Sequence, residues 1–156
     1  MIFRDLNLEK NLIENLESLG YKTLTPIQEN SLKYSLEKKD IIARGKTGSG
    51  KTLAFCLPII NNLDKKKYRV QSLILAPTRE LATQIAQTIR EVLRSTPNIK
   101  VLTLCGGVPY KPQVVSLSHE AHIVVGTAGR VLKHINEGNL KLEDINTFVL
   151  DEADKM

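Results

Sequence analysis

The sequence predicts an α/β fold, a mostly parallel β-sheet with helices on both faces. Strand-length apolar runs lack the alternation of polar and apolar residues that a half-exposed strand shows, so these strands are expected to be buried on both sides. Segments with helical periodicity separate the runs, as in parallel sheets. Polar and glycine-containing motifs follow the runs, at the sheet edge where such folds bind ligands.

Two helices are expected before the first strand. Leucines at helical spacing predict an amphipathic helix over 8–19, with Gly20 placed to end it. A second helix is predicted over 26–38, where Thr25 takes the N-cap position and Gln28 the third helical position. Both are expected to bury their apolar faces in the same domain.

From residue 40 onward, strands and helices alternate. The expected strands are short apolar runs at 40–44, 70–76, 99–104, 122–125 and 146–150. The expected helices cover 51–62, with Pro58 at a tolerated position, and 79–95, 112–118 and 127–138. A chain of 156 residues is long enough for one domain with a substantial core.

The composition is that of an average soluble domain. Hydrophobic residues make up 42% and charged residues 25%, and no apolar run approaches the ~20 residues of a membrane span. Met1 is not followed by a signal-peptide pattern, so we expect a cytoplasmic protein. Cys56 and Cys105 have neither metal-ligand spacing nor a disulfide framework and are interpreted as core residues.

The net charge of +5 permits a polyanionic partner without requiring one. The charge is only mildly clustered. Lys65-Lys66-Lys67, closely followed by Arg69, is interpreted as a solvated loop between a helix and a strand, with a nucleic-acid patch as the alternative.

Residues 45–52 match the P-loop pattern G-x-x-x-x-G-K-[ST] directly after the first expected strand. In such a loop, backbone N–H groups surround a phosphate, the lysine neutralises the terminal phosphates and the hydroxyl holds Mg²⁺. The residues assigned to nucleotide binding here are Thr47, Gly48, Ser49, Gly50, Lys51 and Thr52. The alternative for Lys51 is a solvated lysine at a helix start.

A second motif, 151–154, follows the last expected strand and supplies carboxylates. Asp151 is placed to hold the metal together with Thr52, partly through water. Glu152 is the natural general base for an attacking water molecule, which makes Lys51, Asp151 and Glu152 the catalytic candidates. The alternative for the acidic pair is a plain acidic turn. Together the two motifs predict a site for a nucleoside triphosphate and Mg²⁺.

Read in order, the motifs resemble those of the first RecA-like domain of a DEAD-box RNA helicase. The resemblance covers nearly the whole chain and implies a RecA-like P-loop NTPase domain. The matching segments are Phe3 with Leu6 and Leu8 (upstream aromatic), 20–28 (Q motif), 45–52 (motif I), 77–81 (motif Ia), Gly106-Gly107 (GG motif), 127–130 (motif Ib) and 151–154 (motif II).

The resemblance assigns an adenine site to the Q motif. It implies that Gln28 reads the edge of the base while Phe3 stacks on it, so that ATP is preferred to GTP, and it places Tyr21 in the same site. The residues alone favour a capping box, in which Gln28 reaches back to Thr25. Both can hold, because a glutamine amide offers two donors and an acceptor oxygen.

The resemblance also implies that seven residues grip a single-stranded RNA backbone. They are Thr78, Arg79, Gly106, Gly107, Thr127, Gly129 and Arg130. Hydroxyls, closely approaching glycines and arginines at helix starts suit phosphate binding. Considered singly, the alternatives are a helix cap for Thr127, turns for the glycines and surface ion pairs for the arginines.

Three positions depart from the family pattern. Gly45 stands where alanine is usual, Leu24 where proline is frequent and Ala128 where proline is usual. None of them removes a functional group. Gly45 adds freedom to the loop, and Ala128 loses the fixed φ that proline gives a helix start.

Family members continue beyond motif II to a further strand and a second RecA-like domain that carries arginine fingers. We therefore expect 1–156 to be the first domain, with the Q motif at about 1–29, incomplete at its C-terminal end and without the second domain. The implied topology places the further strand between the P-loop strand and the motif II strand. We accordingly expect no regular pairing between 41–42 and 149–150.

The sequence is thus interpreted as the N-terminal portion of an ATP-dependent RNA helicase. Residues 102–107 and the motif II region look most like bacterial DbpA-type members, which act in ribosome assembly. The expected partners are RNA, including ribosomal RNA, and the second RecA-like domain, with the fragment itself a monomer of little activity. The alternatives are a non-catalytic nucleotide- and RNA-binding fragment, and a P-loop ATPase or kinase without a nucleic-acid role.

Overall fold

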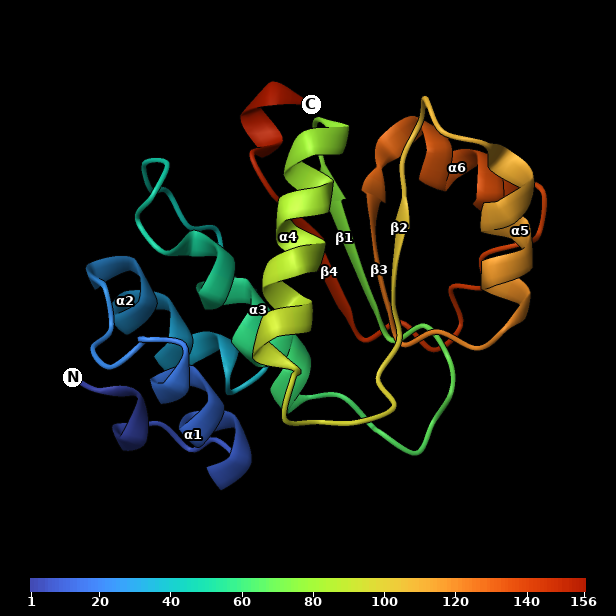
Figure 1. Ribbon diagram of the computed structural model, residues 1–156. Coiled ribbons are helices and arrows are strands. Elements are labelled where there is room, and N and C mark those ends of the chain that lie inside the picture. The colour runs from blue at the N-terminus through green and yellow to red at the C-terminus, as the bar shows by residue number, and fades with distance from the viewer. The chain divides into compact units, whose positions relative to one another are not determined.

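The computed structural model describes all 156 residues, and the contacts within the chain group them into two compact units (Figure 1). The first unit comprises 1–63 and 91–97, and the second comprises 64–90 and 98–156. Each unit is described by itself. No helix in the chain is long and apolar enough to span a bilayer.

The first unit is helical. It contains the 3₁₀ turn η1 (Phe3–Asp5) and the helices α1 (Lys10–Ser18), α2 (Pro26–Ser35) and α3 (Lys51–Asn61). Helix α2 ends at Ser35, whereas the sequence predicted an end at Lys38. Lys38 has a positive φ of 64°, which residues in a right-handed α-helix do not adopt. Pro58 lies within α3 near its end, where the buried ring packs in the core.

The core of the first unit fixes the start of the chain. Leu16, Leu32 and Leu57 are completely buried, and the Phe3 ring is buried with them. Asn15 on α1 donates from Nδ2 to the carbonyl oxygens of Glu91 at 2.9 Å and Val92 at 2.7 Å. These bonds join α1 to 91–97 within the unit.

The predicted strand over 40–44 does not form, and this expectation was wrong. Residues 40–46 have no regular secondary structure, and Ile42 is fully exposed. A strand is stabilised by its neighbours, and the sheet order contains no strand from this segment.

The second unit contains a parallel four-stranded sheet in the order β2-β3-β1-β4. Its strands are β1 (Ser72–Ala76), β2 (Val101–Leu104), β3 (Ile123–Thr127) and β4 (Thr147–Leu150). The helices are α4 (Arg79–Val92, of which 79–90 belong to this unit), α5 (Tyr110–Ser118) and α6 (Ala128–Asn136), with the 3₁₀ turn η2 (Ala153–Lys155). The α/β prediction is confirmed, with elements shorter than expected at most ends.

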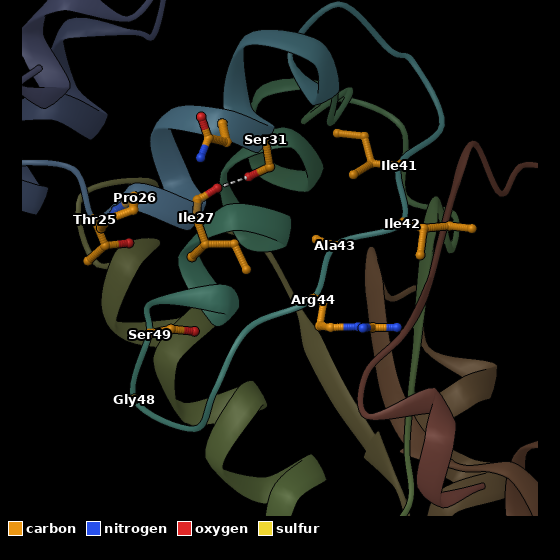
Figure 2. A pocket seen from close by; sticks show the side chains of 11 residues that line it. Thr25, Pro26, Ile27, Ser31, Ile41, Ile42, Ala43, Arg44, Gly48 and Ser49 are labelled. Carbon is orange, nitrogen blue, oxygen red and sulfur yellow. Dashed lines mark hydrogen bonds between the residues drawn. The ribbon is translucent and has the colours of Figure 1, made fainter.

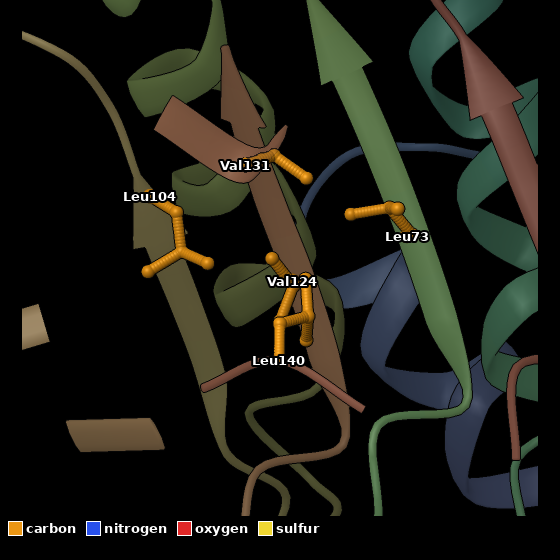
Figure 3. Close-up of a cluster of buried hydrophobic side chains, with 5 residues drawn as sticks. All are labelled: Leu73, Leu104, Val124, Val131 and Leu140. Atoms are coloured by element: carbon orange, nitrogen blue, oxygen red, sulfur yellow. The ribbon is translucent and has the colours of Figure 1, made fainter. Parts of the chain in front are cut away.

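One face of this sheet carries a compact apolar cluster (Figure 3). Leu73, Val124 and Leu104 come from three neighbouring strands and meet Val131 of α6 and Leu140. This packing sets the position of α6 and therefore of the residues at its start.

Strand β4 differs from the buried strands that the sequence suggested. Its residues alternate in burial, and Phe148 and Leu150 are about half exposed. It pairs with β1 alone, so it is an edge strand of the four-stranded sheet. None of its four residues is buried, and its two exposed residues are apolar, so this strand does not have the double coverage that its apolar sequence suggested.

Candidate functional site

The P-loop forms the expected turn at the start of α3. Gly48 and Gly50 have φ of 82° and 89°, a region that glycine adopts at little cost, and Gly50 is the N-cap of the helix. The Ser49 N–H donates to the carbonyl oxygen of Lys46 at 3.1 Å. Lys51 and Thr52 are then the first two residues of α3, where unpaired N–H groups and the helix dipole favour an anion.

Gln28 connects α2 to the P-loop. Its Oε1 accepts from the Thr25 N–H at 2.9 Å, and its Nε2 donates to the Gly50 carbonyl oxygen at 3.1 Å. The side chain is only 3% exposed. The capping role is thus seen, and the bond to Gly50 is a contact that sequence reasoning missed. Reading of adenine by Gln28 stays a prediction.

Gly50 is closely packed against α2, and its φ favours glycine. A Cβ at this position would lie 2.6 Å from Gln28 Nε2 and 2.8 Å from Thr25 Oγ1. Gly45 is also tightly surrounded, with Ile27 Cδ1 at 2.6 Å and Ser49 Oγ at 2.7 Å from the position of its missing Cβ. The first turn of α2 therefore lies directly against the P-loop.

The two aromatic candidates for the base differ in exposure. The Phe3 residue is 1% exposed, whereas Tyr21 is 36% exposed. A base can stack on an aromatic ring only where one face of the ring is accessible. Stacking on Phe3 stays a prediction, and it would require this ring to become uncovered.

A groove of about 640 Å³ lies in the first unit between the start of α2, residues 41–44 and the P-loop (Figure 2). Ser31 Oγ donates to the Ile27 carbonyl oxygen at 2.6 Å beside it, as the dashed line shows. Two other lining residues, Thr25 and Ser49, have buried hydroxyl oxygens without a hydrogen-bond partner. Polar atoms of this kind are suited to accept a ligand or water.

Motif II begins where β4 ends. The Asp151 N–H donates to the Leu75 carbonyl oxygen at 2.9 Å, which continues the β1–β4 ladder, and Asp151 Oδ1 accepts from the Glu152 N–H at 3.1 Å. Glu152 has a φ of 50° and its carboxylate lies 3.6 Å from Lys155 Nζ. Thr52 and Asp151 belong to different units, so their joint metal site stays a prediction.

Three of the predicted RNA-binding segments meet in the second unit, at the carboxyl ends of β1, β2 and β3. We call Thr78, Arg79, Gly106, Gly107, Thr127 and Arg130 the strand-end cluster. The Gly106 N–H donates to Thr127 Oγ1 at 3.2 Å, and Arg130 Nη1 donates to the Val108 carbonyl oxygen at 2.9 Å. Arg79 Nη1 lies 3.1 Å from the position of a Cβ on Gly107, whose φ is 80°.

The alternatives for these residues are partly resolved. Thr127 does not cap α6 with its side chain, because its hydroxyl accepts from Gly106 instead. Thr78 Oγ1 does accept from the Leu81 N–H at 3.2 Å, as a cap would. Gly129 lies on α6 with open space around it, so the structure gives it no packing constraint.

Cys105 lies under this cluster as an inert thiol. Burial raises its pKa above the ordinary value, and the nearby Arg79 and Arg130 only partly oppose this shift. A thiol with a raised pKa is a poor nucleophile. The structure contains no disulfide and no cluster of His, Cys, Asp and Glu side chains suited to a metal ion.

Sequence reasoning missed two residues that support the cluster. Gln113 on α5 and His134 on α6 are both buried, and His134 Nε2 lies 2.8 Å from Gln113 Oε1. His134 follows Arg130 at helical spacing, which was the available signal in the sequence. A lone glutamine in an apolar segment gave no such signal.

Comparison with known proteins agrees with this geometry. The family model described as DEAD/DEAH box helicase matches residues 25–156. The ATP-dependent RNA helicase DbpA of Escherichia coli (strain K12) is 48% identical over 144 residues, which are 92% of this chain and 32% of that protein. The DEAD-box ATP-dependent RNA helicase CshA of Bacillus cereus is 42% identical over 99% of this chain and 29% of its own length.

Solved structures show the same fold. A DEAD box protein from the hyperthermophile Methanococcus jannaschii matches with a TM-score of 0.94 and 41% identity, over all of this chain and 42% of that one. Saccharomyces cerevisiae Dbp5 bound to RNA and ADP BeF3 matches with a TM-score of 0.90 and 30% identity, over 99% of this chain and 39% of that one. The chain spans about a third of the curated relatives. It belongs to the DEAD/DEAH box helicase family.

Proposed function

We propose that this chain is the N-terminal portion of an ATP-dependent RNA helicase. It binds ATP with Mg²⁺ through the P-loop and motif II, and a single-stranded RNA backbone through the strand-end cluster. The observation that carries the proposal is the convergence of a glycine loop, a threonine and two arginines from three strand ends, with Gly106 bonded to Thr127 and Arg130 bonded to the Val108 carbonyl oxygen.

The nucleotide part is supported by the loop at the start of α3. Gly48 and Gly50 are in the conformation that turns N–H groups toward an anion, and Lys51 follows directly. The hydroxyl of Thr52 and the carboxylate of Asp151 are hard oxygen donors, which fit Mg²⁺. When bound, the metal would neutralise charge that develops on the phosphates.

The RNA part is supported by residue chemistry and by a relative. Arg79 and Arg130 provide two positive charges at the edge of a sheet, beside a loop whose glycines allow close approach. Dbp5 of S. cerevisiae, which shares the fold, has been solved bound to RNA. If each arginine contacts one phosphate, the logarithm of the binding constant for single-stranded RNA should fall with the logarithm of the salt concentration with a slope of roughly −1.4. So small a number of phosphate contacts is typical of weak binding.

Hydrolysis and unwinding are assigned to the whole protein together with a second RecA-like domain. Arginine fingers raise the rate of nucleotide hydrolysis by a factor of ~10³ to 10⁵. Because they are expected on the second domain, the chain by itself should hydrolyse ATP slowly. We further propose that the whole protein is cytoplasmic and acts on ribosomal RNA, since residues 102–107 and the motif II region resemble those of bacterial DbpA-type members. By itself the chain is expected to be a monomer, and its expected protein partner is the second RecA-like domain.

The test measures ATP hydrolysis with and without single-stranded RNA, for this chain joined to the remainder of its reading frame. Stimulation by RNA, abolished by Lys51→Ala and weakened by Arg130→Ala, is the expected result. An unstimulated rate would contradict the helicase proposal. Binding without hydrolysis would support the non-catalytic alternative, and unaltered activity of Arg79→Ala and Arg130→Ala would support an ATPase without an RNA role.

A further inference from the structure

A buried amide joins the loop after β2 to helix α6. Gln113 lies on α5 and is 8% exposed. Its Nε2 donates to the carbonyl oxygen of Cys105 at 3.1 Å, and its Oε1 accepts from Arg130 Nη1 at 3.1 Å. Cys105 directly precedes Gly106-Gly107 in the chain. One side chain therefore connects two of the three segments of the strand-end cluster.

The partners allow only one orientation of this amide. The Cys105 carbonyl oxygen can only accept a hydrogen bond, so it must face the NH₂ group of Gln113. The Arg130 guanidinium can only donate, so it must face the oxygen. A flipped amide would place donor against donor and acceptor against acceptor, and it would leave buried groups unpaired.

His134 supplies a third constraint. The His134 residue is completely buried, and its Nε2 lies 2.8 Å from Gln113 Oε1, so Nε2 must carry a proton. Its Nδ1 lies 3.3 Å from the Asn139 Nδ2 amide, which can only donate, so Nδ1 must be unprotonated. The contacts thus define a neutral imidazole in the Nε2–H tautomer.

The surroundings of His134 hold this state in place. The Tyr110 ring stacks on the imidazole with the ring centroids 4.4 Å apart, and the Tyr110 hydroxyl accepts from Asn139 Nδ2 at 2.8 Å and bonds to the Glu137 carboxylate. Lys133 Nζ lies 4.2 Å from the Tyr110 centroid. Burial, and then the charges of Arg130 and Lys133, lower the pKa of His134.

The same contacts leave one edge of Arg130 available. Both bonds that the structure gives the guanidinium, to Val108 and to Gln113, use Nη1. An arginine has five N–H donors, and the two on Nη1 are occupied, which leaves the fork formed by Nε and Nη2. A fork of this kind matches two oxygens of one phosphate.

We propose that Gln113 is the positioning residue for RNA binding, fixing the Arg130 guanidinium relative to the Gly106-Gly107 loop so that its open fork meets a phosphate. His134 keeps the Gln113 amide in its single orientation. This inference rests on the proposed RNA-binding function, and it concerns residues that have no expected contact with RNA themselves.

The test compares Gln113→Met, which nearly preserves the volume but removes the polar groups, with Gln84→Met, a matched change at an exposed position of α4. Binding of a short fluorescein-labelled oligouridine is measured by anisotropy over a range of salt concentrations. Gln113→Met should weaken binding roughly tenfold, the value for loss of about one charge-assisted hydrogen bond. It should also reduce the salt slope by about 0.7, whereas Gln84→Met should change neither.

Arg130→Ala and the double variant separate the possible failures. If Gln113 acts through Arg130, Gln113→Met adds little to Arg130→Ala. If Arg130→Ala weakens binding and Gln113→Met does not, the positioning role is wrong while the RNA function stands. If wild-type chain does not bind the oligonucleotide, the proposed function itself fails.

A measurement on the wild-type chain keeps the inference testable if Gln113→Met does not fold. Nitrogen-15 NMR of His134 should show a neutral imidazole with the proton on Nε2 at pH 7. Gln113→Glu, which keeps an oxygen toward His134 and adds negative charge, should raise the pKa of His134. A proton on Nδ1, or an imidazolium at neutral pH, would overturn the inference.

Discussion

The strand-end cluster of the second unit and the P-loop of the first unit are organised differently. In the strand-end cluster, residues that follow β2 and β3 already bond to each other, as in the Gly106 to Thr127 bond of 3.2 Å, and Arg79 after β1 lies close to Gly107. In the first unit, the segment before the P-loop forms no strand, and the Ser49 hydroxyl is buried without a partner. The strand-end cluster is therefore preorganised, whereas the P-loop still contains a buried polar group without a hydrogen-bond partner.

The comparison teaches where each arrangement obtains its stability. The strand-end cluster stands on a four-stranded sheet and on the apolar cluster beneath α6, so its backbone is fixed by packing. The P-loop is supported mainly by α2, through Gln28 and Ile27. We therefore expect changes in the second unit to alter stability strongly, and changes in the first unit to act mainly on nucleotide binding.

Gly126→Ala should have the largest effect. A Cβ on Gly126 would lie 2.3 Å from the Leu104 carbonyl oxygen and 2.6 Å from Val131 Cγ2, and a backbone atom cannot move aside easily. We expect the free energy of unfolding to fall by about 3 kcal/mol or more, measured by urea denaturation. Gly129→Ala on α6, with nothing near its Cβ, should be neutral or stabilising. Equal effects of the two changes would contradict this packing.

Lys51→Met tests the first unit. Removal of the ammonium at the start of α3 should weaken binding of a Mg²⁺-bound ATP analogue roughly a hundredfold, measured by calorimetry, because charge-assisted bonds to phosphate are lost. Oligouridine binding should be unchanged. Lys10→Met, which alters an exposed lysine on α1, is the control. If Lys51→Met bound the nucleotide as tightly as wild type, the assignment of the P-loop as the nucleotide site would be contradicted.

Acidification should destabilise the second unit through His134. Its pKa lies below the ordinary 6.5, so under mildly acidic conditions the unfolded chain binds a proton that the folded chain does not. Stability should therefore fall as the pH drops from 6.5 toward the folded pKa, by at most about 1.4 kcal/mol per pH unit. Burial also lowers the pKa of His122, which contributes in the same direction.

His134→Gln isolates this contribution. The variant should show a shallower dependence of the unfolding free energy on pH between about 5 and 6.5, where most carboxylates stay ionised. Arg130, Lys133 and, through Tyr110, Glu137 are the charged groups that face this site. A wild-type stability that does not change over this range would show that His134 is not held neutral.

Gly45→Ala should have the smallest effect. The added Cβ meets Ile27 Cδ1 at 2.6 Å and Ser49 Oγ at 2.7 Å, and both atoms end flexible side chains that can rotate. We expect the free energy of unfolding to fall by less than about 1 kcal/mol, with little change in nucleotide affinity. Gly48→Ala, at a φ of 82° with open space, should cost about 1–2 kcal/mol from backbone strain alone. A reversed order would contradict the described loop.

The sequence predicted the sheet and the strand-end motifs because both depend on local patterns. Apolar runs such as 70–76 and the residues after them are read from the chain directly, and helix α4 followed from its periodicity. The strand over 40–44 was predicted wrongly, since an apolar run becomes a strand only beside a partner. The buried Phe3 shows the same limit, because burial depends on distant packing.

The support beneath the cluster could not be predicted. Gln113 and His134 meet across two helices, and their roles follow only from the direction of each donor and acceptor. The bond from Gln28 to the Gly50 carbonyl oxygen is similar, since 22 residues separate its partners. Patterns in sequence locate motifs, whereas hydrogen-bond geometry shows which residues hold them.

The most direct test of the central claim is a nitrogen-15 NMR titration of the chain with oligouridine. The claim is that the second unit presents a preformed phosphate-binding cluster. Resonances of Arg79, Gly106, Gly107, Thr127 and Arg130 should shift progressively with added RNA, while those of the sheet beneath stay in place. Unchanged resonances at these positions, or shifts confined to the Lys65–Lys67 loop, would contradict it.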